Sequence, residues 1–215
     1  MKEIEVLEAA CGKPVHEWNA SDVLKLYKEH SNETSKYYVL REIAKERVND
    51  RDIYELVAPR LQYITYMSSV KILTAVFEKY KKEDNAKLTR EEGKNLKQDI
   101  IDVIKTCDIE LTKLMALNLG LRFFPKDEDL KLENAQELIT NVIKFLFSFD
   151  FTKNLSLVIQ VMQEVIYPVR LQYFKSFGVD LFTSELLVLV NKFEEYINAV
   201  AEEVINKRKE EGGSK

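Results

Sequence analysis

The chain has few of the residues that interrupt helices. Its 215 residues include only 6 glycines and 4 prolines. Both residues disfavour helix interiors, and an all-β domain needs many of them at its turns. Apolar residues make up 46% of the chain and charged residues 32%, as in a folded globular protein. The scarcity of glycine and proline therefore excludes a strand-and-turn protein and predicts an all-α helical bundle.

Cysteine and histidine are also scarce. Cys11 and Cys107 are the only cysteines, and His16 and His30 are the only histidines. Two cysteines make no disulfide framework and match no zinc-ligand spacing, and the histidines lack the Glu-x-x-His pairs of helical di-metal sites. The sequence has no glycine-rich phosphate loop and no centrally placed histidine beside a nucleophile. We expect no metal, no cofactor and no enzymatic activity.

Long apolar runs and a strong charge of one sign are missing as well. No run approaches the roughly 20 residues of a membrane helix, and the acidic start MKEIEVLEA is unlike a signal peptide. The chain carries 32 Lys and Arg against 36 Asp and Glu, a formal net charge of −4. We expect a cytoplasmic protein without a membrane partner, in which only a local basic face is available for nucleic acid.

Apolar spacing and capping residues predict helices along the whole chain. Thr34 or Ser35 is expected to cap the third helix, and Thr89 with Glu92 has the spacing of a capping box. The expected helices cover about 2–11, 20–30, 35–48, 51–58, 59–82, 90–119, 133–149, 151–177 and 184–209. Pro59 is expected either to begin or to kink the long helix that runs to about Lys82. The apolar stripe of this helix is Tyr63, Met67, Val70, Leu73, Phe77 and Tyr80.

The last helix has apolar residues at near-heptad spacing, which predicts that a neighbouring helix packs alongside it. These residues are Leu186, Val190, Phe193, Ile197, Val200 and Val204.

Two segments of the chain resemble one another. Residues 53–67 read IYELVAPRLQYITYM and residues 162–177 read MQEVIYPVRLQYFKSF, with one extra residue, Val169, in the second. Arg60 and Arg170 lie 110 positions apart, about half the chain. This echo predicts a duplication, with similar helical units in tandem over 1–120 and 121–215, packed as one domain or as two lobes. The alternative is coincidence, because helical proteins reuse Leu, Tyr and Arg at similar spacings.

Basic residues and tyrosines gather in two adjacent segments of the first half. Such residues bind phosphates while aromatic rings contact sugars or bases. The set comprises Arg41, Arg47, Arg51, Arg60 and Lys71 with Tyr37, Tyr38, Tyr63 and Tyr66. The alternative is a helix surface of mixed charge whose tyrosines cover the core.

Ser21–Tyr27 (SDVLKLY) and Pro59–Tyr63 (PRLQY) resemble two helical elements of the small, all-helical subunit of type III CRISPR effector complexes, and Asp99–Lys105 resembles its closing helix. The match covers about residues 20–106. The chain departs from that family at Tyr66–Ser69, where an arginine is usual, and in its greater length.

The resemblance implies a non-catalytic scaffold subunit, with RNA and the other subunits of a ribonucleoprotein as partners. It also implies that Arg60 and Arg170 occupy equivalent places. The basic residues expected to contact nucleic acid are Arg41, Arg47, Arg60, Lys71, Arg170 and Lys175. The alternative function is a helical adaptor that binds only protein, through the Leu186–Val204 stripe or the apolar helix at 138–147. Self-association is compatible with both functions.

Overall fold

The protein is helical throughout the part that the computed structural model describes, namely residues 3–29, 32–82, 87–148 and 151–212. This confirms the predicted all-α helical bundle. The first helices are α1 (Glu3–Cys11), α2 (Ala20–Glu29), α3 (Glu33–Glu46), α4 (Arg51–Glu78) and α5 (Arg90–Thr106). They are followed by α6 (Glu110–Phe123), α7 (Ala135–Phe147), α8 (Leu155–Val161), α9 (Tyr167–Phe177) and α10 (Ser184–Gly212). A π-helical turn, Met162–Ile166, joins α8 to α9.

Capping residues fix where several helices begin. The predicted capping box of α5 is confirmed, because Thr89 Oγ1 accepts from the Glu92 N–H and the Glu92 carboxylate accepts from the Thr89 N–H. The predicted cap of α3 is wrong. Asn32 takes that role, since its Oδ1 accepts from the N–H groups of Thr34 and Ser35. An asparagine in this position satisfies donors that the first helical turn leaves free.

The single helix expected over 90–119 is two helices, α5 and α6. The backbone is extended at Cys107 (φ −69°, ψ 135°) and at Ile109 (φ −86°, ψ 105°), which turns the chain back on itself. No glycine or proline marks this break. The side chain of Ile109 is buried there, so tertiary packing sets the turn. The helix α6 also continues past Gly120, where it was expected to stop.

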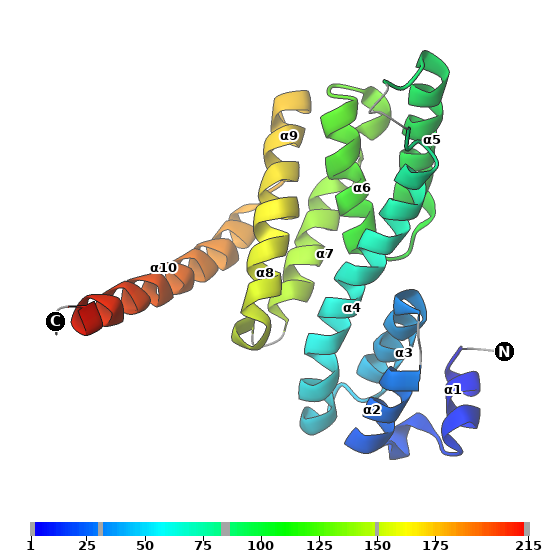
Figure 1. Cartoon of the computed structure of the whole chain (residues 1–215), viewed down its shortest axis with the longest axis vertical. Helices are drawn as coiled ribbons and strands as arrows, with labels where there is room; N and C mark the ends of the chain where they lie inside the picture. The colour runs from blue at the N-terminus through cyan, green and yellow to red at the C-terminus, as the bar shows by residue number, and fades with distance from the viewer. Residues whose placement is uncertain (1–2, 30–31, 83–86, 149–150, 213–215) are drawn as a thin grey trace.

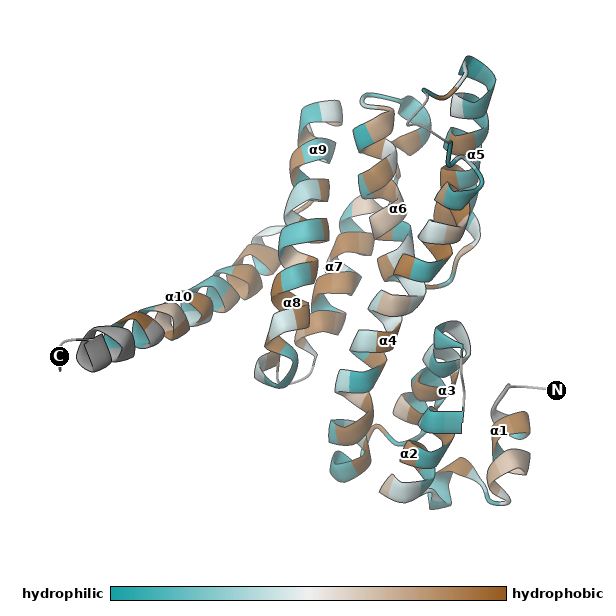
Figure 2. Cartoon of the chain, viewed as in Figure 1, coloured by the Kyte–Doolittle hydropathy of each residue, from teal (hydrophilic) through white to brown (hydrophobic). Residues whose placement is uncertain are grey.

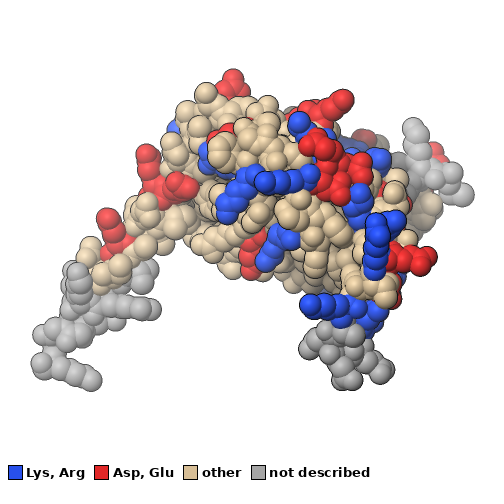
Figure 3. All heavy atoms as spheres, turned by 90° about the horizontal axis from the view of Figure 1, so that it is seen from above, with Lys and Arg blue, Asp and Glu red and all other residues tan. Residues whose placement is uncertain are grey.

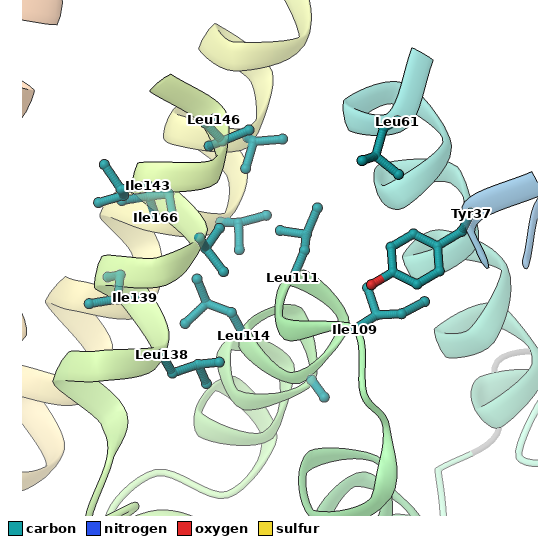
Figure 4. Close-up of a cluster of buried hydrophobic side chains, with 14 of the residues drawn as sticks. Tyr37, Leu61, Ile109, Leu111, Leu114, Leu138, Ile139, Ile143, Leu146 and Ile166 are labelled. Atoms are coloured by element: carbon teal, nitrogen blue, oxygen red, sulfur yellow. The ribbon is translucent and has the colours of Figure 1, made fainter. Parts of the chain in front are cut away.

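Helix α6 lies between α4 and α9 and also packs against α5 and α7 (Figure 1). Apolar side chains from α6, α7 and the π-helical turn meet in one cluster, which includes Leu114, Ile139 and Ile166 (Figure 4). Apolar residues of the bundle helices gather on their inward sides (Figure 2). The expected boundary between units, 120/121, falls inside α6, and both sides of it contribute to the same core.

The face of α4 that is buried is not the apolar stripe predicted from the sequence. Tyr63, the first member of that stripe, is 48% exposed. The buried face instead includes Thr65, Ser68 and Ser69, and the Ser69 and Thr112 hydroxyl oxygens are 2.8 Å apart. Small polar side chains therefore line the contact between α4 and α6.

Helix α10 starts in the core and then extends away from the bundle (Figure 1). Leu186, Val190 and Phe193 are at most 5% exposed. The contacts continue at Tyr196, whose ring is 5.1 Å from that of Phe151, and at Ile197, which packs against the core. In Figure 1 no helix of the described residues lies beside the outer part of α10, so the neighbour predicted from the spacing is present only along its first half. Among the described residues, no helix has a stretch apolar and long enough to span a membrane.

Two glycines in helices give opposite predictions for stability. A Cβ on Gly120 would lie 3.1 Å from Leu130 Cδ2 and 3.2 Å from Ile100 Cγ2, whereas one on Gly93 has nothing within 4 Å. We expect Gly120→Val to lower the free energy of unfolding by about 1–3 kcal/mol through overpacking. Gly93→Ala should raise it by about 1 kcal/mol, because alanine has the higher helix propensity. Denaturant unfolding measures both, and a stabilised Gly120→Val would contradict the packing described for α6.

Candidate nucleic-acid interface

The six basic residues expected to contact nucleic acid do not form one surface. Arg60 and Lys71 share a face of α4, whereas Arg41 faces the start of α6. Three others are dispersed: Arg47 lies against the α1–α2 connection, and Arg170 and Lys175 lie on α9. The six predicted residues therefore lie at several separate places in the fold.

One aromatic residue and two cations follow each other along the outside of α4. Arg60, Tyr63 and Lys71 are 3 and 8 residues apart, a spacing that keeps them on one side of a helix. We call these three residues the α4 outer face. Arg60 Nη1 donates to the Leu56 carbonyl at 2.7 Å, and Lys71 Nζ lies 3.9 Å from the Glu33 carboxylate. Most of the donor groups of both cations are therefore free of protein hydrogen bonds in the described residues.

A lysine and a tyrosine from the neighbouring helices extend this face. Lys36 Nζ lies over the Tyr27 ring, 4.9 Å from its centroid. Burial raises the pKa of Tyr27, and the positive charge of Arg60 acts against this rise, which places the two side chains near one another. Sequence reasoning missed Lys36, because only the packing of α2 beside α3 brings it to Tyr27.

Arg41 joins α3 to the start of α6. Its Nη1 donates to Asp108 Oδ2 at 3.0 Å, and its guanidinium lies 5.8 Å from the Tyr37 ring centroid. Tyr38 donates its hydroxyl to the other Asp108 oxygen at 2.9 Å. Burial and this hydrogen bond raise the pKa of Tyr38 to about 12. The charge of Arg41 is thus already paired with a carboxylate.

A groove beside Arg41 has one part that several charged residues line and one part that is mostly apolar. It consists of a 560 Å³ cavity between α3, α6 and α7 and an adjoining 470 Å³ cavity. Tyr37, Arg41 and Phe145 line both parts, and the exposed side chain of Val48 lies at the edge. Apart from Phe145, the apolar helix at 138–147 faces mainly into the core.

Arg47 has a structural role. Its side chain is 13% exposed, and Nη1 donates to the carbonyls of Val15 and Trp18 at 3.0 and 2.6 Å. Nη2 donates to Asp50. The guanidinium therefore joins the α1–α2 connection to the α3–α4 turn, and the expectation that it contacts nucleic acid is not supported.

Arg170 does not occupy the surroundings of Arg60. Its Nε and Nη2 donate to the two Asp180 oxygens at 2.7 and 2.6 Å, and its guanidinium lies 4.1 Å from the Phe182 ring centroid. This bidentate pair has no counterpart at Arg60 in the described residues. The expectation that the two arginines are equivalent is therefore wrong.

The extra residue in the second segment explains this difference. Each residue advances an α-helix by about 100°, so one insertion turns the shared RLQY sequence to another side. Tyr63 is 48% exposed and its counterpart Tyr173 2%, whereas Leu61 is 8% exposed and Leu171 51%.

Lys175 is exposed near the end of α9, next to Phe174, which is 54% exposed. Arg122 and the exposed Phe123 lie at the end of α6, the helix beside it. Figure 3 looks onto this end of the bundle and shows basic and acidic groups interleaved. Sequence reasoning treated Arg122 and Phe123 only as a helix break, although a cation next to an aromatic ring was a signal for a binding surface.

His16 and the two cysteines, which are the described residues of these types, form no metal site. His16 is exposed and 3.7 Å from the Glu17 carboxylate, and His30 lies outside the described residues. Within the described ranges, no three His, Cys, Asp or Glu side chains are grouped so that they could hold a metal ion.

Comparisons with protein-family models, with curated proteins and with solved structures find no match to this chain.

The structural role of Arg47 predicts a loss of stability on substitution. Arg47→Met leaves two backbone carbonyls without their charged donor, and hydrogen bonds of this kind are worth about 2 kcal/mol. We expect a decrease of that size in the free energy of unfolding. Arg51→Met is the control, because Arg51 is 88% exposed in a surface pair, and should change stability by less than about 0.5 kcal/mol. Equal effects would contradict the role of Arg47.

The Arg170–Asp180 pair predicts acid-sensitive stability. The hydrogen bond from Arg170 lowers the pKa of Asp180 below its unfolded value of about 3.9. A lowered carboxylate pKa stabilises the folded state above the unfolded value and loses this effect as pH falls through the folded one. The stability difference between the wild type and Asp180→Asn should therefore be largest near neutral pH and shrink below about pH 4. Denaturant unfolding at several pH values tests this, and a constant difference would contradict it.

Proposed function

We propose that the chain is a non-catalytic helical scaffold subunit of an RNA-guided ribonucleoprotein similar to type III CRISPR effectors, and that it contacts RNA through the α4 outer face. The observation that carries the proposal is the row of Arg60, Tyr63 and Lys71 on one exposed side of a single helix, beside Lys36 and Tyr27.

The dimensions of this face suit a single strand. Arg60 and Lys71 are eleven residues apart, which corresponds to about 16 Å along a helix. A stacked strand carries one phosphate per about 3.4 Å, so the face covers about four or five phosphates. Tyr63 lies between the two cations, where its exposed ring suits contact with a base or a sugar.

The net charge of −4 requires that such a contact be local. Arg60, Lys71 and Lys36 provide three cations, and each neutralised phosphate of a single strand contributes about 0.7 to the slope of log K against log salt. Binding should therefore be weak and should show a slope of about 2.

Anisotropy titrations of labelled single-stranded RNA over a salt series test the proposal. Arg60→Glu/Lys71→Glu should weaken binding at least tenfold at low salt and reduce the salt slope. Lys144→Glu/Lys192→Glu is the matched control, because it changes the net charge equally at exposed positions on α7 and α10. Equal losses in both variants, or no binding by the wild type at any salt concentration, would contradict the proposal.

The groove at Tyr37, Arg41 and Phe145 favours the adaptor as a second candidate function. The part of the groove beside Ala44 and Val48 is mostly apolar, and Arg41 is already paired with Asp108, so this part suits a protein side chain better than a phosphate. A protein partner should co-purify from the native host after ribonuclease treatment and be lost with Ala44→Arg, which fills the groove. Retention of that partner by the Ala44→Arg variant would contradict this function.

A further inference from the structure

Helix α10 is anchored in the bundle at one end only. Its Phe193 ring is 5.2 Å from that of Phe147 and 5.6 Å from that of Phe151, and Phe151 also meets Tyr196 at 5.1 Å. These edge and tilted contacts hold the first half of the helix against the end of α7 and the turn that precedes α8. The second half, residues 198–212, continues as helix into open space (Figure 1).

The projecting half needs a partner for physical reasons. A lone helix of about 15 residues is marginal in water, because most helical stability in proteins comes from packing of an apolar face. The apolar spacing of the anchored half, which ends at Ile197, continues into the projecting half at Val200, which is only partly buried. Val190, Ile197 and Val204 are seven residues apart in the sequence, which is the spacing at which two helices pack along one another.

The charges along α10 indicate what that partner is. Within residues 198–212 the sequence is acidic at Glu202 and Glu203, basic at 207–209, which reads KRK, and acidic again at Glu210 and Glu211. An antiparallel second copy puts Glu202 and Glu203 of each helix beside the basic residues 207 and 208 of the other. A parallel copy puts like charges together. The helix is therefore complementary to itself in one orientation.

We propose that residues 198–212 of α10 pair antiparallel with the same segment of a second copy of this chain, and so form a two-helix contact outside the bundle. The proposal does not depend on whether the bundle binds RNA or protein. Since α10 leaves the bundle before this segment begins, both copies keep the α4 outer face uncovered by α10.

Sedimentation velocity of the full chain over a range of concentrations tests this. We expect the mass to rise with concentration from 25.1 kDa to twice that value. Val200→Glu, on the stripe, should raise the dissociation constant at least tenfold. Val188→Glu is the control, because Val188 is 57% exposed on the same helix but off the stripe, and should leave the dissociation constant unchanged. Unchanged thermal unfolding of both variants shows that the bundle is intact.

The salt dependence of dimerisation distinguishes antiparallel from parallel pairing. High salt should weaken antiparallel association, because it screens the attraction between the acidic and basic stretches. A dimer strengthened by salt would overturn the antiparallel arrangement. A wild-type chain that is monomeric at all concentrations, or a dimer that Val200→Glu leaves intact, would overturn the pairing itself.

Discussion

The bundle depends on how α6 is held between α4 and α9. Pro168 has no N–H to bond the carbonyl of Glu164 one turn earlier, and Asn118 of α6 donates its side-chain amide to that carbonyl at 3.2 Å. On the opposite side, the Ser69 and Thr112 hydroxyls join α4 to α6. Because an unsatisfied buried polar group is costly, these contacts allow few other positions for α6. They hold the two halves of the chain in one core.

Buried polar side chains also explain which parts of the fold could be predicted from sequence. Glycine, proline and capping residues affect the backbone close to their own positions. Most helices, and the capping box at Thr89, were therefore predictable. The buried face of α4 was not, since it contains Gln62, which reads as a surface residue. Its amide donates to the carbonyls of Phe145 and Leu146 at 3.2 and 3.1 Å, where α7 ends. The break at Ile109 was missed because it depends on what that side chain packs against.

The same limit applies to the candidate interface. Sequence shows where cations are but not what they bind, and Arg47 and Arg170 are held by carbonyls and a carboxylate that lie elsewhere in the fold. Arg60 and Lys71 were predictable because their spacing on one helix keeps them together. The echo at PRLQY was misleading for a geometrical reason. The two RLQY segments are offset by one helical residue, so their identical side chains point toward different neighbours. The repeated sequence therefore marks no site that the two halves share.

The use of charge inside the bundle bears on the proposed functions. Arg41, Arg47 and Arg170 are paired with acids or carbonyls of the same chain, so their charges are not free to bind a polyanion. The features that remain available lie apart, because α4 and the projecting half of α10 are on different sides of the molecule (Figure 1). Two separated contact surfaces can be occupied at once. The proposed scaffold role, in which one partner is joined to another, requires two such surfaces.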